Sequence, residues 1–313
     1  MNTSIIRNTI GRLLQLLAIL LIAPLLVSIL YQEGLRNQLS FLIPIVLSFL
    51  AGKFIATSKY IEFLGAKEAW VITALVWLVY SIFGALPYML SGTLPSYVDS
   101  FFETMSGFTT TGSTVIANVE AISKSILFWR SFTLFIGGLG VVVFALAILP
   151  ASGRNMTQVM KVEATGPTFG KLASKISDTA KILYRIYLVM TIFFIIILAL
   201  GPMDLFDSIL HVFGAAGTGG FGIKNTSILF YNDLYSEVVV GIAMLLFGVN
   251  FHLYYMILLG RAKDIFKSEE LKAYFIILIS SIILIMINLA SQYESIAKLF
   301  RDVSFTVTSF ITT

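Results

Sequence analysis

The sequence predicts an all-α integral membrane protein built from repeated units, and two observations carry that prediction. The first is composition: 58% of the 313 residues are hydrophobic and 12% are charged, whereas a soluble domain has about 25% charged residues. The second is a repeat, because DSFFETMSGFTTTG (Asp99–Gly112) and DSILHVFGAAGTGG (Asp207–Gly220) follow one pattern. Each begins with Asp-Ser, continues with a short and mostly apolar stretch, and ends in a Thr/Gly run.

A helix needs about 20 apolar residues to cross the hydrocarbon core of a bilayer. Seven stretches are predicted to do so: Leu13–Tyr31, Leu39–Ala56, Ala69–Leu90, Ile126–Pro150, Ile182–Leu200, Val238–Leu259 and Ala273–Leu289. The first is predicted to be a retained span, because its apolar run is too long for a signal peptide and lacks a small-residue cleavage site. Three shorter apolar segments, at 97–108, 204–216 and 302–311, are predicted to be re-entrant helices.

The distribution of Lys and Arg predicts the orientation of the chain. With a cytoplasmic N-terminus, fifteen of the 21 Lys and Arg residues fall on the cytoplasmic side, as the positive-inside rule requires. All three re-entrant segments then lie on the outer face. The net charge of +4 follows from this topology, so we expect contact with a lipid bilayer and no nucleic-acid partner.

The Thr/Gly runs have the composition of a cation filter. A dehydrated potassium ion needs several oxygen ligands, and a ring of backbone carbonyls supplies them without a charge that would trap the ion. Turning carbonyls inward favours Gly where φ is positive, and both Thr109–Gly112 and Gly217–Gly220 contain Gly and Thr. The preceding short helix would direct the negative end of its dipole at the ion. Asp99, Asp207 and Asp302 would be caps or first-turn acids at the outer end.

The predicted architecture is therefore a set of span–pore helix–filter–span units around a cation pathway, preceded by an N-terminal two-span hairpin. The parts are the hairpin at 1–66, repeat 1 at 67–151 with a filter at 109–112, a cytoplasmic connector at 152–176, repeat 2 at 177–263 with a filter at 217–220, and a partial repeat 3 at 264–313. The partial repeat ends in DVSFTVTSFITT (Asp302–Thr313), in which Thr312-Thr313 correspond to Thr109-Thr110.

Three features of the spans have more than one interpretation. Arg130 lies at the outer end of its span, where snorkelling to the interface is favoured, and pairing with an acid such as Glu237 is the alternative. The Gly137-Gly138-Leu139-Gly140 cluster favours close helix packing over bending near the pathway. Asn250, in the middle of a predicted span, should face protein or a water-filled path.

The sequence contains no Ser/His/Asp or HExxH arrangement, so we do not expect an enzyme. Gly217-x-Gly219-x-x-Gly222 matches a dinucleotide-binding pattern, but that motif needs a preceding strand and a following helix. A membrane oxidoreductase using this motif is the alternative from another class of protein, and a non-transporting membrane scaffold is a third. His211 and His252 have no companions at metal-ligand spacing, so packing is favoured over metal binding.

Several segments resemble the Trk/Ktr/HKT superfamily of potassium transporters. They are ETMSGFTTTG (Glu103–Gly112), WRSFTLFIGGLGVVVFALAILP (Trp129–Pro150), KVEATGP (Lys161–Pro167), GTGGFG (Gly217–Gly222), GVNFHLYY (Gly248–Tyr255) and EELKAYF (Glu269–Phe275). The N-terminal hairpin and the KVEATGP connector are more similar to the TrkH and TrkG type than to the shorter KtrB.

The resemblance implies four repeats around one potassium pathway in a bacterial inner membrane, a homodimer, and a cytosolic nucleotide-binding regulatory subunit similar to TrkA. It implies K⁺ as the transported ion, with no organic cofactor in this chain. Carried over by position, the ion sites would be lined by Thr110, Thr111, Gly112, Thr218, Gly219, Gly220 and Thr313, with Thr109, Gly217 and Thr312 adjacent. Relative to the superfamily, the sequence is expected to be truncated at its C-terminus, inside the third filter.

The function expected from these features is potassium uptake through a carbonyl-lined filter, as the symport-type membrane subunit of a Trk-type system. The alternative within transport is a sodium-dependent cation transporter of the KtrB or HKT type. In this sequence Thr111 is followed by Gly112, so the Ser-for-Gly exchange that would favour sodium is absent from the first filter.

Overall fold

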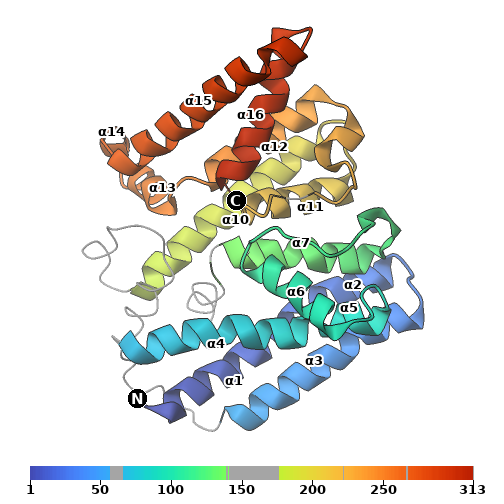
Figure 1. Cartoon of the computed structure of the whole chain (residues 1–313). Coiled ribbons are helices and arrows are strands. Elements are labelled where there is room, and N and C mark those ends of the chain that lie inside the picture. Colours follow the sequence, from blue (N-terminus) through green and yellow to red (C-terminus); the bar gives the residue numbers. More distant parts are fainter. Residues whose placement is uncertain (57–65, 139, 141–175, 221, 266, 313) are drawn as a thin grey trace.

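The computed structural model describes residues 1–56, 66–138, 140, 176–220, 222–265 and 267–312, and over these residues it is α-helical without β-strands. The helices are α1 (Thr3–Leu20), α2 (Ile22–Leu30), α3 (Leu35–Ile55), α4 (Ala66–Gly84), α5 (Leu86–Ser91), α6 (Tyr97–Phe108), η1 (Val119–Ala121), α7 (Lys124–Gly138), α10 (Ile176–Ala199), α11 (Leu205–Ala216), η3 (Ser227–Tyr231), α12 (Leu234–Phe247), α13 (Phe251–Leu258), α14 (Ala262–Ile265), α15 (Glu269–Leu289), η4 (Ala290–Gln292) and α16 (Ile296–Thr312). The predicted all-α class is confirmed. In the view of Figure 1, α1–α7 occupy the lower half and α10–α16 the upper half.

Five segments in the described part of the chain are long and apolar enough to cross a membrane, and they correspond to five of the predicted spans. They are Thr3–Leu30, Leu35–Ile55, Lys67–Ser91, Lys181–Ala199 and Glu269–Gln292. The predicted span Ile126–Pro150 coincides with α7 as far as Gly138, and Leu139 and residues 141–150 lie outside the described residues.

The predicted span over Val238–Leu259 is not a single straight helix, because α12 and α13 meet at an angle of 85°. The break follows from local chemistry at Asn250. Its side chain accepts a hydrogen bond of 3.0 Å from the His252 backbone N–H and so caps the start of α13. The amide nitrogen of Asn250 also donates to Glu270, at 3.1 Å from one carboxylate oxygen. Asn250 therefore contacts protein, as predicted, but at a helix start and not in the middle of a span.

The first helix begins at Thr3, well before the predicted start of the first span at Leu13. Asn2 caps it by accepting hydrogen bonds from the backbone N–H groups of Ser4 and Ile5. Ile5, Ile6 and Ile10 are buried, so the first turns pack against protein although charged residues lie among them. The predicted span covers only the apolar run, whereas the helix extends further towards the N-terminus.

The backbones of α1 and α3 lie against one another at two glycines. A Cβ added to Gly52 would lie 2.5 Å from the Gly11 carbonyl oxygen, and one added to Gly11 would lie 2.8 Å from the Gly52 carbonyl oxygen. Small residues at such crossings allow the close approach that stabilises helix pairs in membranes.

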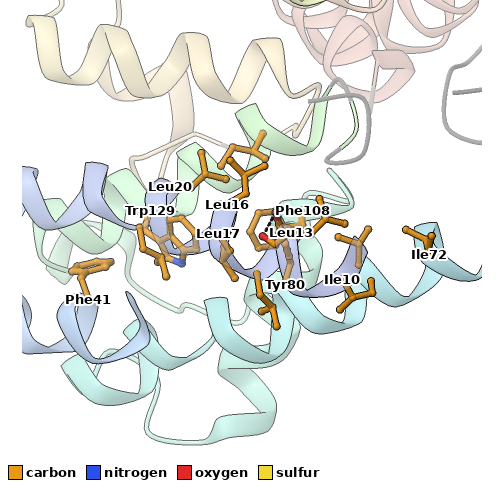
Figure 2. Packing of buried hydrophobic residues seen from close by; sticks show 14 of the residues in the cluster. Ile10, Leu13, Leu16, Leu17, Leu20, Phe41, Ile72, Tyr80, Phe108 and Trp129 are labelled. Atoms are coloured by element: carbon orange, nitrogen blue, oxygen red, sulfur yellow. Dashed lines mark hydrogen bonds between the residues drawn. The ribbon is translucent and has the colours of Figure 1, made fainter. Parts of the chain in front are cut away.

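A buried apolar cluster joins α1 and α4 to the end of the short helix α6. Figure 2 shows Tyr80 and Phe108 beside Leu13, with Trp129 further along the same layer. The Tyr80 hydroxyl donates to the Leu13 carbonyl oxygen at 2.8 Å, and the Phe108 ring packs edge to face against both Tyr80 and Trp129. The Trp129 indole N–H donates to the Gly84 carbonyl oxygen at 3.0 Å. The cluster therefore fixes where α6 ends.

A second apolar cluster surrounds the short helix α11. The Phe135 ring on α7 stacks on Tyr187 of α10 and on Phe213 of α11, with ring centroids 4.9 and 4.5 Å apart. The Tyr187 hydroxyl also donates to the Phe135 carbonyl oxygen at 2.8 Å. Helix α7 thus packs against both short helices, one in each cluster.

The short helices predicted at 97–108 and 204–216 are confirmed as α6 and α11. The third, predicted at 302–311, is longer, because α16 runs from Ile296 to Thr312. Leu299 and Val303 of α16 are buried against Leu278 of α15, and this packing extends the helix before Asp302. Asp302 therefore lies in the second turn, so its prediction as a cap or first-turn acid is wrong.

We predict that Gly52→Ala destabilises the protein, because the new methyl group would overlap the backbone of Gly11 and force α1 and α3 apart. Overpacking of this kind costs about 1–3 kcal/mol. The midpoint of thermal unfolding in detergent measures the effect. Gly34→Ala is the control, since no atom lies within 4 Å of a Cβ at Gly34. Equal midpoints for the two variants would contradict the close contact.

Candidate functional site

The site that the sequence predicts lies where α6 and α11 end. Both helices begin in the same way: Ser96 caps α6 by accepting from the Asp99 backbone N–H, and Asp204 caps α11 by accepting from the Asp207 N–H at 2.7 Å. Asp99 and Asp207 therefore lie in the first turns, as predicted, where a carboxylate stabilises the positive end of the helix dipole. The residues that perform the capping lie three positions earlier and were not predicted.

Both helices also end in the same hydrogen-bonded turn. After α6, Thr110 N–H donates to the Gly107 carbonyl at 3.0 Å and Thr111 N–H to the Ser106 carbonyl at 2.9 Å. After α11, Thr218 N–H donates to Ala215 and Gly219 N–H to Gly214 at the same two distances. These pairs of bonds define a Schellman motif, in which the residue just beyond the helix adopts a left-handed conformation.

The backbone conformations of the two loops agree position by position. Thr110 and Thr218 have φ of +54° and +51°, and Gly112 and Gly220 have φ of +74° and +73°. Glycines of the Thr/Gly runs were predicted at positions with positive φ, which is confirmed for Gly112 and Gly220, whereas Gly217 has φ of −75°. The positive φ of the two threonines was not predicted, because β-branched residues rarely adopt this conformation. Backbone strain that recurs at one register in separate loops is typical of functional sites.

The side chains of the first loop form a local network. The Thr109 hydroxyl donates to the Met105 carbonyl at 2.7 Å and lies 2.8 Å from the Thr111 hydroxyl. Thr109 and Thr111 are exposed, whereas Gly217 and Gly219 of the second loop are buried. The two loops therefore share a backbone and differ in side chains and in burial.

Two consecutive glycines of α7 allow both short helices to approach it. A Cβ on Gly137 would lie 2.3 Å from the Phe108 carbonyl oxygen at the end of α6. A Cβ on Gly138 would lie 2.8 Å from the Ala216 carbonyl oxygen at the end of α11. The close packing predicted for this glycine cluster is confirmed for these two members. The last turn of α7 therefore separates the two loops and contacts both.

A buried ion pair lies next to the segments that follow the two loops. Arg130 Nε donates to a carboxylate oxygen of Glu103 at 2.9 Å, and both side chains are almost fully buried. The same carboxylate accepts hydrogen bonds from the Thr114 hydroxyl and the Val115 backbone N–H, and Arg130 Nη1 donates to the Gly222 carbonyl at 3.1 Å. The prediction that Arg130 snorkels to the interface is wrong.

The predicted alternative partner of Arg130, Glu237, pairs with Arg301 instead. The nearest guanidinium and carboxylate atoms of that pair, joining α12 to α16, are 2.5 Å apart. The sequence could not choose between the acids, because the choice depends on which helices pack against one another. Glu103 could have been identified as the partner of Arg130 by its position in α6, because its carboxylate faces the loop that follows this helix.

Asn225, beyond the second loop, joins it to the segment beyond the first. Its side-chain oxygen accepts from the Val119 backbone N–H at 3.0 Å, and its side-chain nitrogen donates to Asn118 at 2.9 Å. The Asn225 backbone N–H donates to Glu120 at 2.9 Å. This connection between the repeats was not predicted from the sequence.

The two histidines lie in packed surroundings. His211 Nδ1 is 2.9 Å from the Asp207 carbonyl, and its ring packs edge to face on Tyr231. The Asp207 carboxylate accepts from the Tyr231 hydroxyl at 2.6 Å and pairs with Lys224 at 3.2 Å. Burial and the hydrogen bond to Asp207 raise the pKa of Tyr231 above the ordinary value of a tyrosine. His252 is buried near Tyr255.

The remaining predicted site residues have mixed outcomes. Thr312 is the last residue of α16, and its hydroxyl donates to the Thr308 carbonyl at 2.9 Å. Thr313 and the 152–175 part of the connector lie outside the described residues. The Gly217-x-Gly219-x-x-Gly222 pattern follows helix α11, and no strand occurs in the part of the chain that the structure describes. The strand that a dinucleotide-binding motif requires is therefore missing before it.

We predict that Thr110→Gly stabilises the protein by about 1 kcal/mol, because glycine removes the cost of a left-handed β-branched residue. Thr109→Gly is the matched control: Thr109 has φ of −82° and donates to Met105, so glycine there should destabilise. Unfolding midpoints in detergent measure both effects. A loss of stability in Thr110→Gly as large as that in Thr109→Gly would contradict the assigned strain.

Comparison with known proteins gives relatives along the whole chain. The chain is 30% identical to the Trk system potassium uptake protein TrkH of Halomonas elongata over 318 residues, covering 100% of this chain and 66% of the relative. It is 32% identical to TrkG of Escherichia coli, covering 90% and 60%, and 32% identical to an uncharacterized cation transporter of the archaeon Methanocaldococcus jannaschii, covering 98% and 63%. The chain thus spans less than two thirds of the length of these relatives.

The fold comparison agrees. The crystal structure of the potassium transporter TrkH from Vibrio parahaemolyticus matches with a TM-score of 0.84 at 28% identity, covering 99% of this chain and 64% of that chain. The family model described as TrkH, cation transport protein, matches residues 38–306. This match includes α6, α11 and both loops that follow them. The chain therefore belongs to the TrkH family of cation transport proteins, which are multi-pass membrane proteins.

Proposed function

We propose that this protein takes up potassium as the membrane subunit of a Trk-type system, and that the loops after α6 and α11 are two of its ion filters. The observation that carries the proposal is the shared conformation of these loops, with positive φ at Thr110 and Gly112 and again at Thr218 and Gly220. A left-handed β-branched residue at the same register in two loops of different sequence is typical of a shared functional task.

The task that fits this backbone is coordination of a dehydrated cation. In each Schellman turn the amides bond back to the helix, so the carbonyls of the loop itself remain available as ligands. The C-terminal dipole of each short helix adds partial negative charge at the same place. In this proposal Thr110, Thr111 and Gly112 line the path in the first repeat, Thr218, Gly219 and Gly220 line it in the second, and Thr313 begins the third set.

The names of the relatives support potassium as the cation, since the similar proteins from Halomonas and Escherichia are potassium uptake proteins. We also propose that the protein lies in a bacterial inner membrane with its N-terminus in the cytoplasm, because the distribution of Lys and Arg favours that orientation. The proposal further includes a homodimer and a cytosolic nucleotide-binding regulatory subunit similar to TrkA. The cytoplasmic connector at 152–176 is the proposed surface for that subunit.

We predict that Gly220→Asp reduces potassium uptake about tenfold or more, a change that corresponds to about 1.4 kcal/mol. The reason is that the new side chain would strain a loop with φ of +73° and place a charge beside the path. Rubidium uptake is measured in a bacterial strain without its own potassium systems, with the protein expressed from its complete source gene and its amount in the membrane determined. Gly260→Asp is the matched control, with φ of +75°, open surroundings and a position far from both loops in sequence. Equal uptake by Gly220→Asp and the unaltered protein would overturn the filter assignment.

The same bacterial cells can test the alternative of a sodium-dependent transporter of the KtrB or HKT type. We expect potassium uptake to proceed at an undiminished rate when sodium is replaced by choline, because the first loop has Gly112 where a Ser would favour sodium. A requirement for sodium would replace this part of the proposal with the sodium-dependent alternative.

A further inference from the structure

We propose that Glu103 and Arg130 form a positioning pair that holds the two filter loops in register with one another, so that ion preference depends on this pair. The inference rests on the proposed function. It states that two buried residues outside the filters control how the filters are arranged.

Glu103 holds the chain that leaves the first filter. Its side chain is fully buried, and its two oxygens accept from the Thr114 hydroxyl at 2.9 and 3.0 Å. One of these oxygens also accepts from the Val115 backbone N–H at 3.0 Å. A single carboxylate on α6 therefore fixes the residues that immediately follow Gly112 and Ser113.

Arg130 extends this attachment to the second filter. Its Nε donates to Glu103, and its Nη1 donates to the carbonyl of Gly222, two residues beyond Gly220. The planar guanidinium has donors at fixed angles, so the two bonds set the direction from one segment to the other. Arg130 thus connects the exits of both filters from one position on α7.

Stability alone does not account for this pair. A buried ion pair contributes little net stability compared with well-packed apolar residues, because desolvation offsets most of the attraction. Apolar side chains could hold α6 against α7, as Phe108 and Trp129 already do. Only directional donors and acceptors can fix the positions of the Val115 N–H and the Gly222 carbonyl.

The second repeat lacks a carboxylate of its own at this place. By the spacing between the repeats, His211 corresponds to Glu103, and Gly222 corresponds to Thr114. His211 Nδ1 lies against the Asp207 carbonyl, while its Nε2 is buried without a hydrogen-bond partner in the described part of the chain. The second filter therefore depends on Arg130 for an attachment that the first filter obtains from Glu103.

A natural control exists in the second acid–base pair of the same composition, Glu237 with Arg301. It joins α12 to α16, and its side chains are 10% and 33% exposed. The bonds of the Glu237 carboxylate run to Arg301, not to the chain that follows a filter. Weakening this pair should alter helix packing and leave the relation between the first two filters unchanged.

The test uses Arg130→Lys and Glu103→Asp. Arg130→Lys keeps the positive charge with fewer hydrogen-bond donors, and Glu103→Asp keeps the negative charge on a shorter side chain. Rubidium uptake and its inhibition by potassium and by sodium are measured in cells, normalised to the amount of protein in the membrane. The same protein, purified in detergent, is heated in potassium or in sodium. We expect the preference for potassium over sodium to fall about tenfold, the effect of losing one charge-assisted hydrogen bond. We also expect the extra thermal stabilisation by potassium to disappear.

Glu237→Asp is expected to keep the preference of the unaltered protein. If Arg130→Lys does not accumulate in the membrane, Thr114→Val replaces it, since this change removes the hydroxyl that donates to Glu103 and accepts from the Ile116 backbone N–H while leaving the ion pair in place. For Thr114→Val we expect a fall in preference of about threefold.

Each outcome decides a separate question. Unchanged preference in Arg130→Lys and Glu103→Asp, or in Thr114→Val where it is the substitute, overturns the positioning role. A loss of preference that is equally large in Glu237→Asp also overturns it, because the cause is then general destabilisation. If the unaltered protein itself shows no preference for potassium, the proposed function fails first, and the positioning role fails with it.

Discussion

The close approach of α7 to the ends of two short helices is the constraint on which the rest of the site depends. Gly137 admits the last carbonyl of α6, and Gly138 admits that of α11, at distances that leave no room for a Cβ. One rigid helix therefore sets the separation of both loops. Side chains at these two positions would push the loops apart, and no rearrangement of the loops themselves could compensate, because the obstructing atoms belong to the backbone.

Apolar packing then determines where each short helix stops. Phe108 is held by Tyr80 and Trp129, and the ring of Phe213 is stacked on Phe135, so the two helices are anchored in different clusters on either side of α7. A helix end fixed in this way can support a strained turn. The left-handed Thr110 and Thr218 persist because the surrounding contacts allow no other path for the chain.

Polar contacts add what apolar packing does not supply, which is direction. The Glu103 carboxylate orients the exit of the first loop, Arg130 reaches from it to the second, and Asn225 joins the two exits further along. The first contact lies within the first repeat, whereas those of Arg130 and Asn225 cross from one repeat to the other, so the second loop is held partly by the first repeat. This arrangement explains why two repeats with different side chains, Thr-rich in one and Gly-rich in the other, have the same backbone.

Local sequence determined the helical class, most of the spanning helices, the two short helices at 97–108 and 204–216, and the positive φ of Gly112 and Gly220. These features depend on apolar length, on capping residues and on the lack of a Cβ, all of which act within a few residues along the chain. The start of α1 and the length of α16 were misplaced because buried neighbours extended both helices beyond their apolar runs. The bend at Asn250 was missed because a capping residue inside an apolar stretch looks like any other polar residue in a span.

Only the tertiary structure decided the partners of the charged residues and the strain of the loops. The sequence does not indicate which acid pairs with Arg130, and the choice of Glu103 over Glu237 depends on how α6 lies against α7. The left-handed Thr110 and Thr218 contradict the local preference of threonine, so no local rule could predict them. Both outcomes arise from contacts between segments distant in the chain, whereas the repeat itself, with its recurring Asp-Ser and Thr/Gly runs, was determined by the sequence alone.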